Sequence, residues 1–438
     1  MYDLNSLQVR PPVPAAARLA KGSTMATASE SIEPTAGRPV GCPVFHQDFS
    51  EPKPLGSHWA LADRMREQGP LYFNTFAQGY WIFTRHDAVK DIYKNPEIFS
   101  SESITPWEPE PIYRLVPTQI DRPDHIKYRR ILNPWFSPAR MDEAEPLVRG
   151  ICRRLVEETA PLGRTNFVDE FALRYPTEVF LAVIGIDLAD ADRFLVWVDD
   201  FFRGFGGDPN GQQAMAAALQ GIRQYWVDAL AERRDDPELR EGDIVSYLLN
   251  VKYDDERPLT DEERLDMLTV LVLAGLDTTR AQLGYMWRHL ALHPEDRRRL
   301  IDEPEIIPYA VEEVLRYYTM IFGDGRKVTQ DIEFHGAQLK KGDMVYGLVS
   351  AANRDPRVWE RADEYVIDRK KNNHFGFASG PHRCLGMHLA RREMQVAVEE
   401  WLRVIPDFRL ATDGEIMERG GGAMTAPLDL PLEWEVAS

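Results

Sequence analysis

The stretch Phe377-Ala378-Ser379-Gly380-Pro381-His382-Arg383-Cys384-Leu385-Gly386 holds a cysteine in a glycine-rich loop, just before a predicted helix at residues 386–404. Free backbone N–H groups and the dipole at a helix N-terminus stabilise a thiolate. The glycines let the backbone approach a flat partner closely, and Phe377 can shield the sulfur from water. A buried free thiol at a helix start is the simpler interpretation of a cysteine taken alone.

Composition excludes several classes of protein. The chain has 438 residues with a net charge of −18, which argues against general binding to nucleic acid or anionic lipid. Its three cysteines, Cys42, Cys152 and Cys384, are too widely spaced for a disulfide framework or a zinc ribbon, so we expect a reducing cytoplasm. The longest apolar stretch, Met267 to Leu276, falls well short of the ~20 residues of a membrane-spanning helix. We therefore expect neither secretion nor a membrane anchor.

The pattern along the chain predicts a mostly helical fold with a smaller β region. Residues 1–40 are rich in Ala, Pro, Ser and Thr without apolar periodicity, which predicts a mobile tail, and residues 41–438 are expected to form a single domain. Aromatic runs at 71–73 and 80–83 predict a β-hairpin. Residues from about 124 to 300 are mostly helical in pattern.

One predicted helix is unusually long. A capping-box pattern, Thr260-Asp261-Glu262-Glu263, begins it, and His293-Pro294 ends it. About 32 residues at ~1.5 Å each give a rod of roughly 48 Å, long enough to cross a domain. Within it, Ala274-Gly275-Leu276-Asp277-Thr278-Thr279 interrupts the apolar pattern. A threonine hydroxyl that bonds to an i−4 carbonyl loosens a helix, and glycine weakens it further. A helix end would explain the same residues, but the apolar pattern continues to Trp287.

Three motifs together resemble the cytochrome P-450 family: the Cys384 loop, Glu313-x-x-Arg316 and the stretch from Ala274 to Thr279 in the long helix. The Cys384 loop matches its haem-binding signature, Phe-x-x-Gly-x-x-x-Cys-x-Gly, without a gap. Glu313-x-x-Arg316 matches a second signature, a buried pair that braces the cysteine loop. The resemblance implies the cytochrome P-450 fold over residues 41–438, one haem b, and Cys384 as the thiolate ligand of the iron. It also implies that Gly275 opens an oxygen-binding groove, that Thr278 assists dioxygen activation and that Asp277 relays protons.

The resemblance implies further partners. Haem propionates are carboxylates that need charge-assisted partners, and the residues at the family positions are His125, Arg129, Arg326 and His382. Nothing in the chain resembles a flavin or NAD(P)H fingerprint, so we expect electrons from a [2Fe–2S] ferredoxin with its reductase. The expected docking residues on the cysteine side are Lys127, Arg129, Arg130 and Arg383.

The similarity is greatest to bacterial members that hydroxylate camphor, notably at residues 324–343 and 388–393. This implies a small, compact hydrophobic substrate, such as the bicyclic monoterpenoids camphor or cineole, with Tyr113 as donor to a substrate oxygen. The other expected pocket residues are Val270, Leu273, Phe322 and Met424. The chain departs from that pattern in a shortened loop containing Trp107 and in Ala423-Met424, which replace two β-branched residues.

Two alternatives remain open at this stage. A peroxide-driven haem-thiolate oxygenase would need no ferredoxin, but such relatives usually lack the Asp277-Thr278 pair. A haem-thiolate sensor or ligand-binding protein would need no proton relay and would form no product.

Overall fold

The computed structural model describes residues 42–49, 51–111, 113–204, 209–235, 242–411, 414–420 and 422–436, so the predicted tail at 1–40 lies outside the described residues. The α-helices are α1 (Ser57–Gln68), α2 (His86–Lys94), α3 (Asp124–Leu132), α4 (Pro138–Thr159), α5 (Arg174–Ile184), α6 (Ala191–Arg203), α7 (Pro209–Asp235), α8 (Ile244–Asn250), α9 (Asp261–Leu292), α10 (Pro294–Asp302), α11 (Ile307–Tyr317), α12 (Val349–Ala352) and α13 (Met387–Val404). The strands are short, and the prediction of a mostly helical fold with a smaller β region is confirmed.

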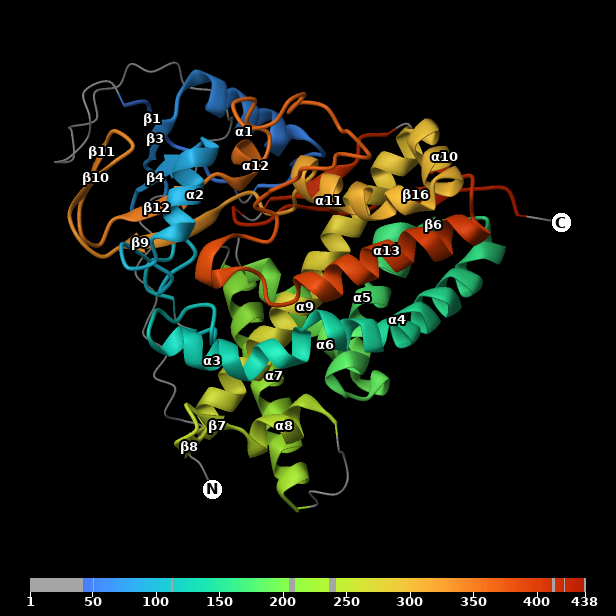
Figure 1. Ribbon diagram of the computed structural model, residues 1–438, viewed down its shortest axis with the longest axis horizontal. Helices are drawn as coiled ribbons and strands as arrows, with labels where there is room; N and C mark the ends of the chain where they lie inside the picture. Colours follow the sequence, from blue (N-terminus) through green and yellow to red (C-terminus); the bar gives the residue numbers. More distant parts are fainter. Residues whose placement is uncertain are drawn as a thin grey trace. The chain divides into compact units, whose positions relative to one another are not determined.

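Helix α9 is the central element of the helical part. Its N-terminus is fixed by the predicted capping box, in which the Thr260 side chain accepts from the Glu263 backbone while the Glu263 side chain accepts from the Thr260 backbone. The helix runs 32 residues, as predicted, and most of its side chains are buried. It contacts α5, α6, α7, α11 and α13, and Figure 1 shows it passing behind α13, which lies beside α4. An apolar helix buried on most sides can present residues to a cavity in mid-helix.

The main sheet lies at the upper left of Figure 1, and its six strands have the order β1-β3-β4-β12-β9-β5. The predicted hairpin is formed by β3 and β4, which pair antiparallel with Leu71 opposite Phe83. The bounds are β1 (Val44–Phe45), β3 (Leu71–Asn74), β4 (Tyr80–Phe83), β5 (Phe99–Ser100), β9 (Asp324–Val328) and β12 (Met344–Gly347). Helices α1, α2 and α12 belong to this part of the chain, and α12 contacts both of the others.

The remaining strands form small separate sheets, in which segments far apart in the sequence meet. Their bounds are β2 (Lys53–Pro54), β6 (Arg164–Asn166), β7 (Lys252–Tyr253), β8 (Arg257–Pro258), β10 (Ile332–Phe334), β11 (Ala337–Leu339), β13 (Arg409–Leu410), β14 (Met417–Arg419), β15 (Ala426–Pro427) and β16 (Pro431–Glu433). Strand β14 pairs with β2 and with β15, which brings the last part of the chain to the N-terminus of α1.

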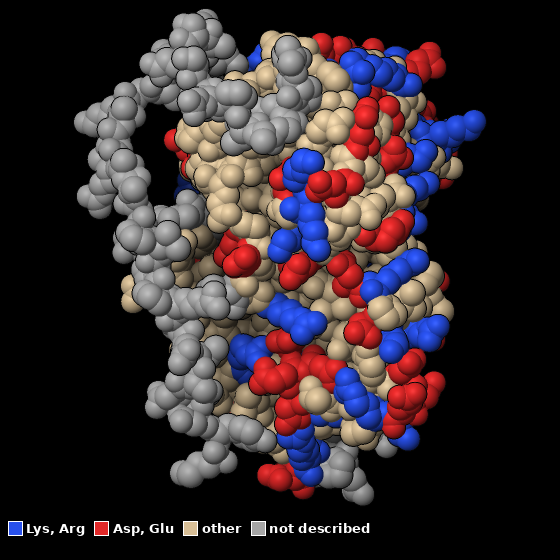
Figure 2. Space-filling model, turned by 90° about the vertical axis from the view of Figure 1, so that its left-hand side faces the viewer, with Lys and Arg blue, Asp and Glu red and all other residues tan. Residues whose placement is uncertain are grey.

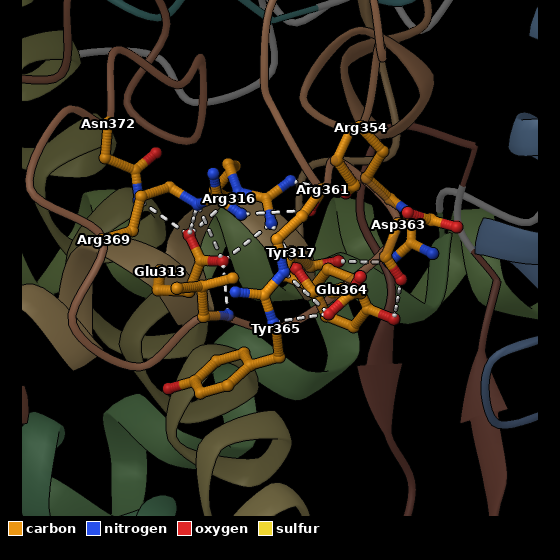
Figure 3. A network of polar contacts seen from close by, with 12 residues as sticks. Glu313, Arg316, Tyr317, Arg354, Arg361, Asp363, Glu364, Tyr365, Arg369 and Asn372 are labelled. Carbon is orange, nitrogen blue, oxygen red and sulfur yellow. Dashed lines mark hydrogen bonds and ion pairs between the residues drawn. The ribbon is translucent and has the colours of Figure 1, made fainter.

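A long segment between α12 and α13 is held by side chains rather than by regular structure. Glu313 and Arg316 on α11 form a two-bond ion pair, with N–O distances of 2.7 and 2.9 Å, and both side chains are fully buried. Arg316 also donates to the carbonyls of Asn353, Ala362 and Glu364. Figure 3 shows these residues converging from the helix and from the segment.

The same carboxylate accepts from two more residues of that segment. Arg369 Nε lies 3.0 Å from Glu313 Oε2, and Asn372 donates to the same oxygen at 2.9 Å. Asn353, at the other end of the network, accepts from the backbone N–H of Phe375. The Glu313 network therefore connects α11 to the chain that leads into the cysteine loop.

The surface carries charges of both signs. On the face shown in Figure 2, acidic and basic side chains are interspersed, without a large area of one sign. Among the helices that the structure describes, none is both long and apolar enough to span a bilayer.

Loss of Arg316 is expected to destabilise the protein much more than loss of a nearby exposed arginine. Arg316→Ala leaves the Glu313 carboxylate buried without its main partner, which typically costs ~3–5 kcal/mol. Arg361→Ala is the matched control, because Arg361 forms an exposed ion pair with Glu364 in the same region, and such pairs contribute ~0–1 kcal/mol. Urea unfolding followed by fluorescence measures both. Equal midpoints for the two variants would contradict the role of the Glu313 network.

Candidate functional site

The cysteine loop is shaped by two glycines. A Cβ on Gly380, whose φ is +69°, would lie 2.2 Å from the carbonyl oxygen of Tyr93. A Cβ on Gly376 would lie 2.7 Å from the carbonyl oxygen of Leu315. The loop can therefore lie against α2 and α11 only because these positions lack side chains. The backbone N–H of Cys384 donates to the carbonyl of Phe377 at 2.9 Å, which closes the loop just before α13.

A second ion pair connects α13, the helix that follows the cysteine loop, to α11. Arg391 on α13 donates to Glu312 at 2.5 and 2.8 Å, and its guanidinium lies 4.6 Å from the centre of the Phe377 ring. Burial would raise the pKa of Glu312, but hydrogen bonds from Arg391 and His374 lower it to about 2. Phe377 is buried, so Arg391 packs against the first side chain of the cysteine loop while it pairs with Glu312.

Cys384 opens onto an interior cavity of about 390 Å³. The cavity is walled mostly by apolar side chains, among them Phe201 and Phe202 of α6 and Val270 and Leu273 of α9. The thiol is accessible from this space although it lies deep in the protein. Burial raises the pKa of Cys384. A hydrogen bond that its sulfur accepts from the backbone N–H of Gly386, and the charge of Arg129, oppose that rise.

Cationic groups gather at one side of the cavity. Arg129, Arg326 and His382 line it, and the ring of His125 lies 4.0 Å from that of His382. Arg326 pairs with Asp324 at 2.8 Å, whereas Nδ1 of His125 is buried without a hydrogen-bond partner. Burial, together with the charges of nearby arginines, lowers the pKa of His125 to about 4 and that of His382 to about 2.

This arrangement fits a haem. Cationic and donor groups around a cavity are costly to bury unless an anion pairs with them, and the two haem propionates would supply that anion. The thiol of Cys384 opens onto the same cavity, where it would meet the iron. The four residues expected at the propionates therefore lie together, near the predicted metal ligand.

The predicted groove on α9 also faces this cavity. Gly275 and Thr278 line it, and the Thr278 hydroxyl donates to the carbonyl of Ala274 at 2.9 Å, the i−4 bond anticipated from the sequence. Phe180 fills the space that a side chain at Gly275 would need, since a Cβ there would lie 2.5 Å from its ring. Asp277 is only 3% exposed and is not among the cavity-lining residues. Its carboxylate forms an ion pair with Arg419.

The predicted pocket residues divide into two groups. Val270, Leu273 and Met424 line the cavity, whereas Tyr113 and Phe322 do not. The Tyr113 hydroxyl donates to Glu108 at 3.2 Å, because the loop folds back on itself and supplies its own acceptor. Phe322 is fully buried beside Phe49 on the sheet side of the chain. Contact of Tyr113 and Phe322 with a substrate therefore stays a prediction.

The four residues predicted to dock an electron donor differ in how exposed their charges are. Arg129 lines the cavity, so it does not serve as an exposed docking residue. Lys127 lies 3.3 Å from Asp254, which neutralises part of its charge. Arg130 and Arg383 are exposed. Arg130 also lies 3.9 Å from Asp254, so Arg383 presents its charge most openly among the four expected docking residues.

Three residues at or near the site have contacts that the sequence did not predict. Arg369 completes the Glu313 network, and Arg419 binds Asp277 across 142 positions of sequence. Glu393 lines the cavity as a buried carboxyl group, and burial raises its pKa well above the usual range despite a hydrogen bond from Thr279. A lone arginine or glutamate in a strand or helix carries no local signal of this kind, since its partner is set by the tertiary fold.

Comparison with known proteins agrees with this geometry. A family model described as Cytochrome P450 matches residues 196–418. The chain is 32% identical over 366 residues to a mycinamicin IV hydroxylase/epoxidase of Micromonospora griseorubida, covering 82% of this chain and 90% of that protein. It is 30% identical over 372 residues to a steroid C26-monooxygenase of Mycolicibacterium smegmatis, covering 84% and 90%.

Solved structures agree as well. The crystal structure of CYP101J2 has a TM-score of 0.82 at 28% identity and covers 93% of this chain and 100% of that chain. That of cytochrome P450 CYP101C1 has a TM-score of 0.80 at 30% identity and covers 91% and 99%. The likeness to these proteins extends well beyond the cysteine loop to most of the chain. The chain is therefore a haem b-binding monooxygenase of the cytochrome P450 family.

Proposed function

We propose that this monooxygenase hydroxylates a C–H bond of a small, compact hydrophobic molecule, a bicyclic monoterpenoid such as camphor or cineole. The observation that carries this proposal is the cavity. Its volume is about 390 Å³ and its walls are largely apolar, with Phe201, Phe202 and Met424 among them. The haem would occupy the part of this cavity next to Cys384, and the apolar side chains elsewhere on its wall suit a hydrophobic substrate.

The balanced reaction takes the C–H bond, dioxygen, two electrons and two protons to an alcohol and water. The haem, when bound, supplies the activation of dioxygen, and a thiolate ligand favours cleavage of its O–O bond. In this proposal Cys384 is that ligand, and His125, Arg129, Arg326 and His382 hold the propionates. The apolar walls exclude bulk water, which would otherwise quench the reaction.

Protons would reach the site through α9. Asp277 carries a carboxylate at the buried end of a polar cluster that includes Arg280, and Thr278 has a hydroxyl at the cavity wall. A carboxyl group and a hydroxyl in sequence can move a proton inward, which is general acid catalysis. This pair also favours an oxygen-activating enzyme over a sensor or a peroxide-driven oxygenase, neither of which needs it.

The electron donor is proposed to be a [2Fe–2S] ferredoxin with its reductase, and the location to be the cytoplasm. Arg130 is 73% exposed in its side chain, and Arg383 is exposed beside Cys384. Two such cations can attract an acidic partner to the face nearest the thiol. Neither Cys152 nor Cys384 takes part in a disulfide, which supports a reducing compartment.

The substrate is tested with a panel of bicyclic monoterpenoids. Camphor, cineole and related compounds are expected to displace water from the haem and shift its spin state, because they fill a compact apolar cavity. Reaction with dioxygen, NADH, a ferredoxin and its reductase should then give a hydroxylated product, measured by gas chromatography. A steroid or a macrolide serves as the oversized comparison. Turnover of the oversized compounds alone would overturn the proposed substrate class.

Cys384→Ser is expected to abolish the absorbance band that the reduced carbon monoxide complex owes to thiolate ligation. A serine hydroxyl is protonated at neutral pH and binds iron poorly. Cys152→Ser is the matched control, because Cys152 is also buried but lies away from the cavity. An unchanged band in Cys384→Ser would show that another residue holds the iron.

Thr278→Ala is expected to consume NADH in the presence of substrate but to divert most of the electrons to hydrogen peroxide. The loss of the hydroxyl removes the last proton donor of the pair at the cavity wall. Thr278→Ser, which keeps a hydroxyl, should remain coupled. The ratio of product to NADH consumed measures the effect. Full coupling in Thr278→Ala would mean that Thr278 has no part in proton delivery.

A further inference from the structure

Arg419 has unused hydrogen-bond donors at the wall of the cavity. It is the last residue of β14, it lines the cavity, and 21% of its side chain is accessible. Its Nη2 donates to the carboxylate of Asp277. Nε and Nη1 form no hydrogen bond with any residue that the structure describes, yet neither is sealed from accessible space. A guanidinium has five N–H donors, so these two nitrogens need further acceptors.

The strand that carries Arg419 is fixed by its neighbour, and the guanidinium is anchored by its bond to Asp277. The neighbouring residue, Glu418, is fully buried and accepts from Nδ1 of His58 at 2.9 Å, from the backbone of Gly56 at 3.1 Å and from the Tyr285 hydroxyl at 2.9 Å. Successive side chains of a strand point to opposite faces. Glu418 therefore fixes the strand on one side while Arg419 reaches Asp277 and the cavity on the other. A donor held in place before binding loses little entropy when a ligand arrives.

The charge of Arg419 is already compensated. Asp277 forms an ion pair with Arg419, and Arg280 lies 3.6 Å from Asp277 and 3.8 Å from Asp169. This cluster of two arginines and two aspartates has no excess positive charge to attract an anion. A carboxylate ligand would have to compete with Asp277, whereas a neutral oxygen needs only a spare N–H group.

Three other polar side chains in or near the cavity wall are already engaged. The Tyr113 hydroxyl donates to Glu108, and that of Thr278 donates to Ala274. The amide of Gln282 donates to the carbonyls of Val314 and Tyr318 and accepts from the backbone of Met320. Arg419 therefore offers a donor to a substrate oxygen without requiring Tyr113 to leave Glu108.

We propose that Arg419 binds a neutral oxygen of the substrate, a ketone or an ether, and so determines which carbon faces the haem. This inference rests on the proposed function, because it assumes that the substrate occupies the same cavity. The ring of Phe202, 5.5 Å from the guanidinium, would then contact the hydrocarbon part of the ligand beside the bound oxygen. The substrate class becomes a compact hydrocarbon skeleton with one hydrogen-bond acceptor.

The test uses pairs of ligands that differ by one carbonyl group. Camphor and camphane, cyclohexanone and cyclohexane, and a tetracyclic steroid ketone with its parent hydrocarbon are titrated into the ferric holoenzyme. The spin shift gives each dissociation constant, and wild type is compared with Arg419→Met, which is similar in size but has no donor. Within each pair that binds, the ketone should weaken by about 10- to 100-fold in Arg419→Met, as expected for a bond to a charged group. The hydrocarbon should change by less than about twofold, since it makes no hydrogen bond.

The ratio within a pair separates recognition from structural damage, because a distorted cavity weakens both members. Equal weakening of ketone and hydrocarbon, or no change in either, overturns the role of Arg419. Arg419→Lys is the control for the ion pair, since it keeps a cation beside Asp277 without the spare nitrogens. Because the lysine ammonium still carries N–H donors, Arg419→Lys should keep part of the ketone preference, and a preference lost equally in Arg419→Lys and Arg419→Met would show that the planar guanidinium is required.

Failure of the proposed function gives a different result. If the bicyclic pair does not bind to wild type and the steroid pair does, the compact substrate is wrong. The ketone preference within the steroid pair still tests Arg419. The size of ligand that binds therefore reports on the proposed function, and the ratio within a pair reports on this inference.

Discussion

The buried ion pair between Glu313 and Arg316 supports the whole approach to the cysteine loop. Between α12 and α13 the chain makes few of the backbone hydrogen bonds that helices and sheets provide, so its carbonyls need other donors. Arg316 supplies three such bonds, to Asn353, Ala362 and Glu364, while Glu313 accepts from the backbone of Val366. A buried ion pair adds little stability by itself, because desolvation offsets the attraction. Its effect here is to fix one path for an irregular segment.

The cavity imposes a second constraint, which joins folding to cofactor binding. His125 and His382 lie within contact distance, with Arg129 and Arg326 at the same side of an apolar space. Such a group of donors is stable only when an anion completes it. A ligand that binds the folded chain but not the unfolded chain stabilises the fold by mass action. Stability and haem content should therefore rise and fall together in this protein.

Local patterns in the sequence were sufficient for the parts of the structure that local chemistry controls. The capping box at Thr260 fixed one end of α9, and the spacing around Cys384 placed the thiol before α13. The i−4 bond of Thr278 follows from side-chain chemistry within one helical turn. These features need no information about distant residues, which is why they could be predicted.

The contacts that the sequence did not reveal lie where loops and strands meet. Tyr113, which the resemblance places as donor to a substrate oxygen, lies on a loop that brings Glu108 within hydrogen-bond reach of its hydroxyl. The Phe322 side chain packs against Phe49 on the sheet side of the chain and does not line the cavity. The partner of Asp277 lies on β14, and no periodicity links residues that far apart. Loop conformation and strand register decide such contacts, and a single sequence contains little information on either.

Arg419 contacts both Asp277 and the cavity, and the shape of its side chain suits it to both contacts. A guanidinium is a planar fork, so one nitrogen can hold the carboxylate of Asp277 while the others remain available to the cavity. A lysine at this position would present a single nitrogen to both. A substrate oxygen bound to Arg419 would not displace Asp277, and the acid would stay in place while the ligand is oriented. Because Glu418 fixes β14, both the orientation of the substrate and the position of Asp277, the proposed proton-relay acid, would depend on one short strand.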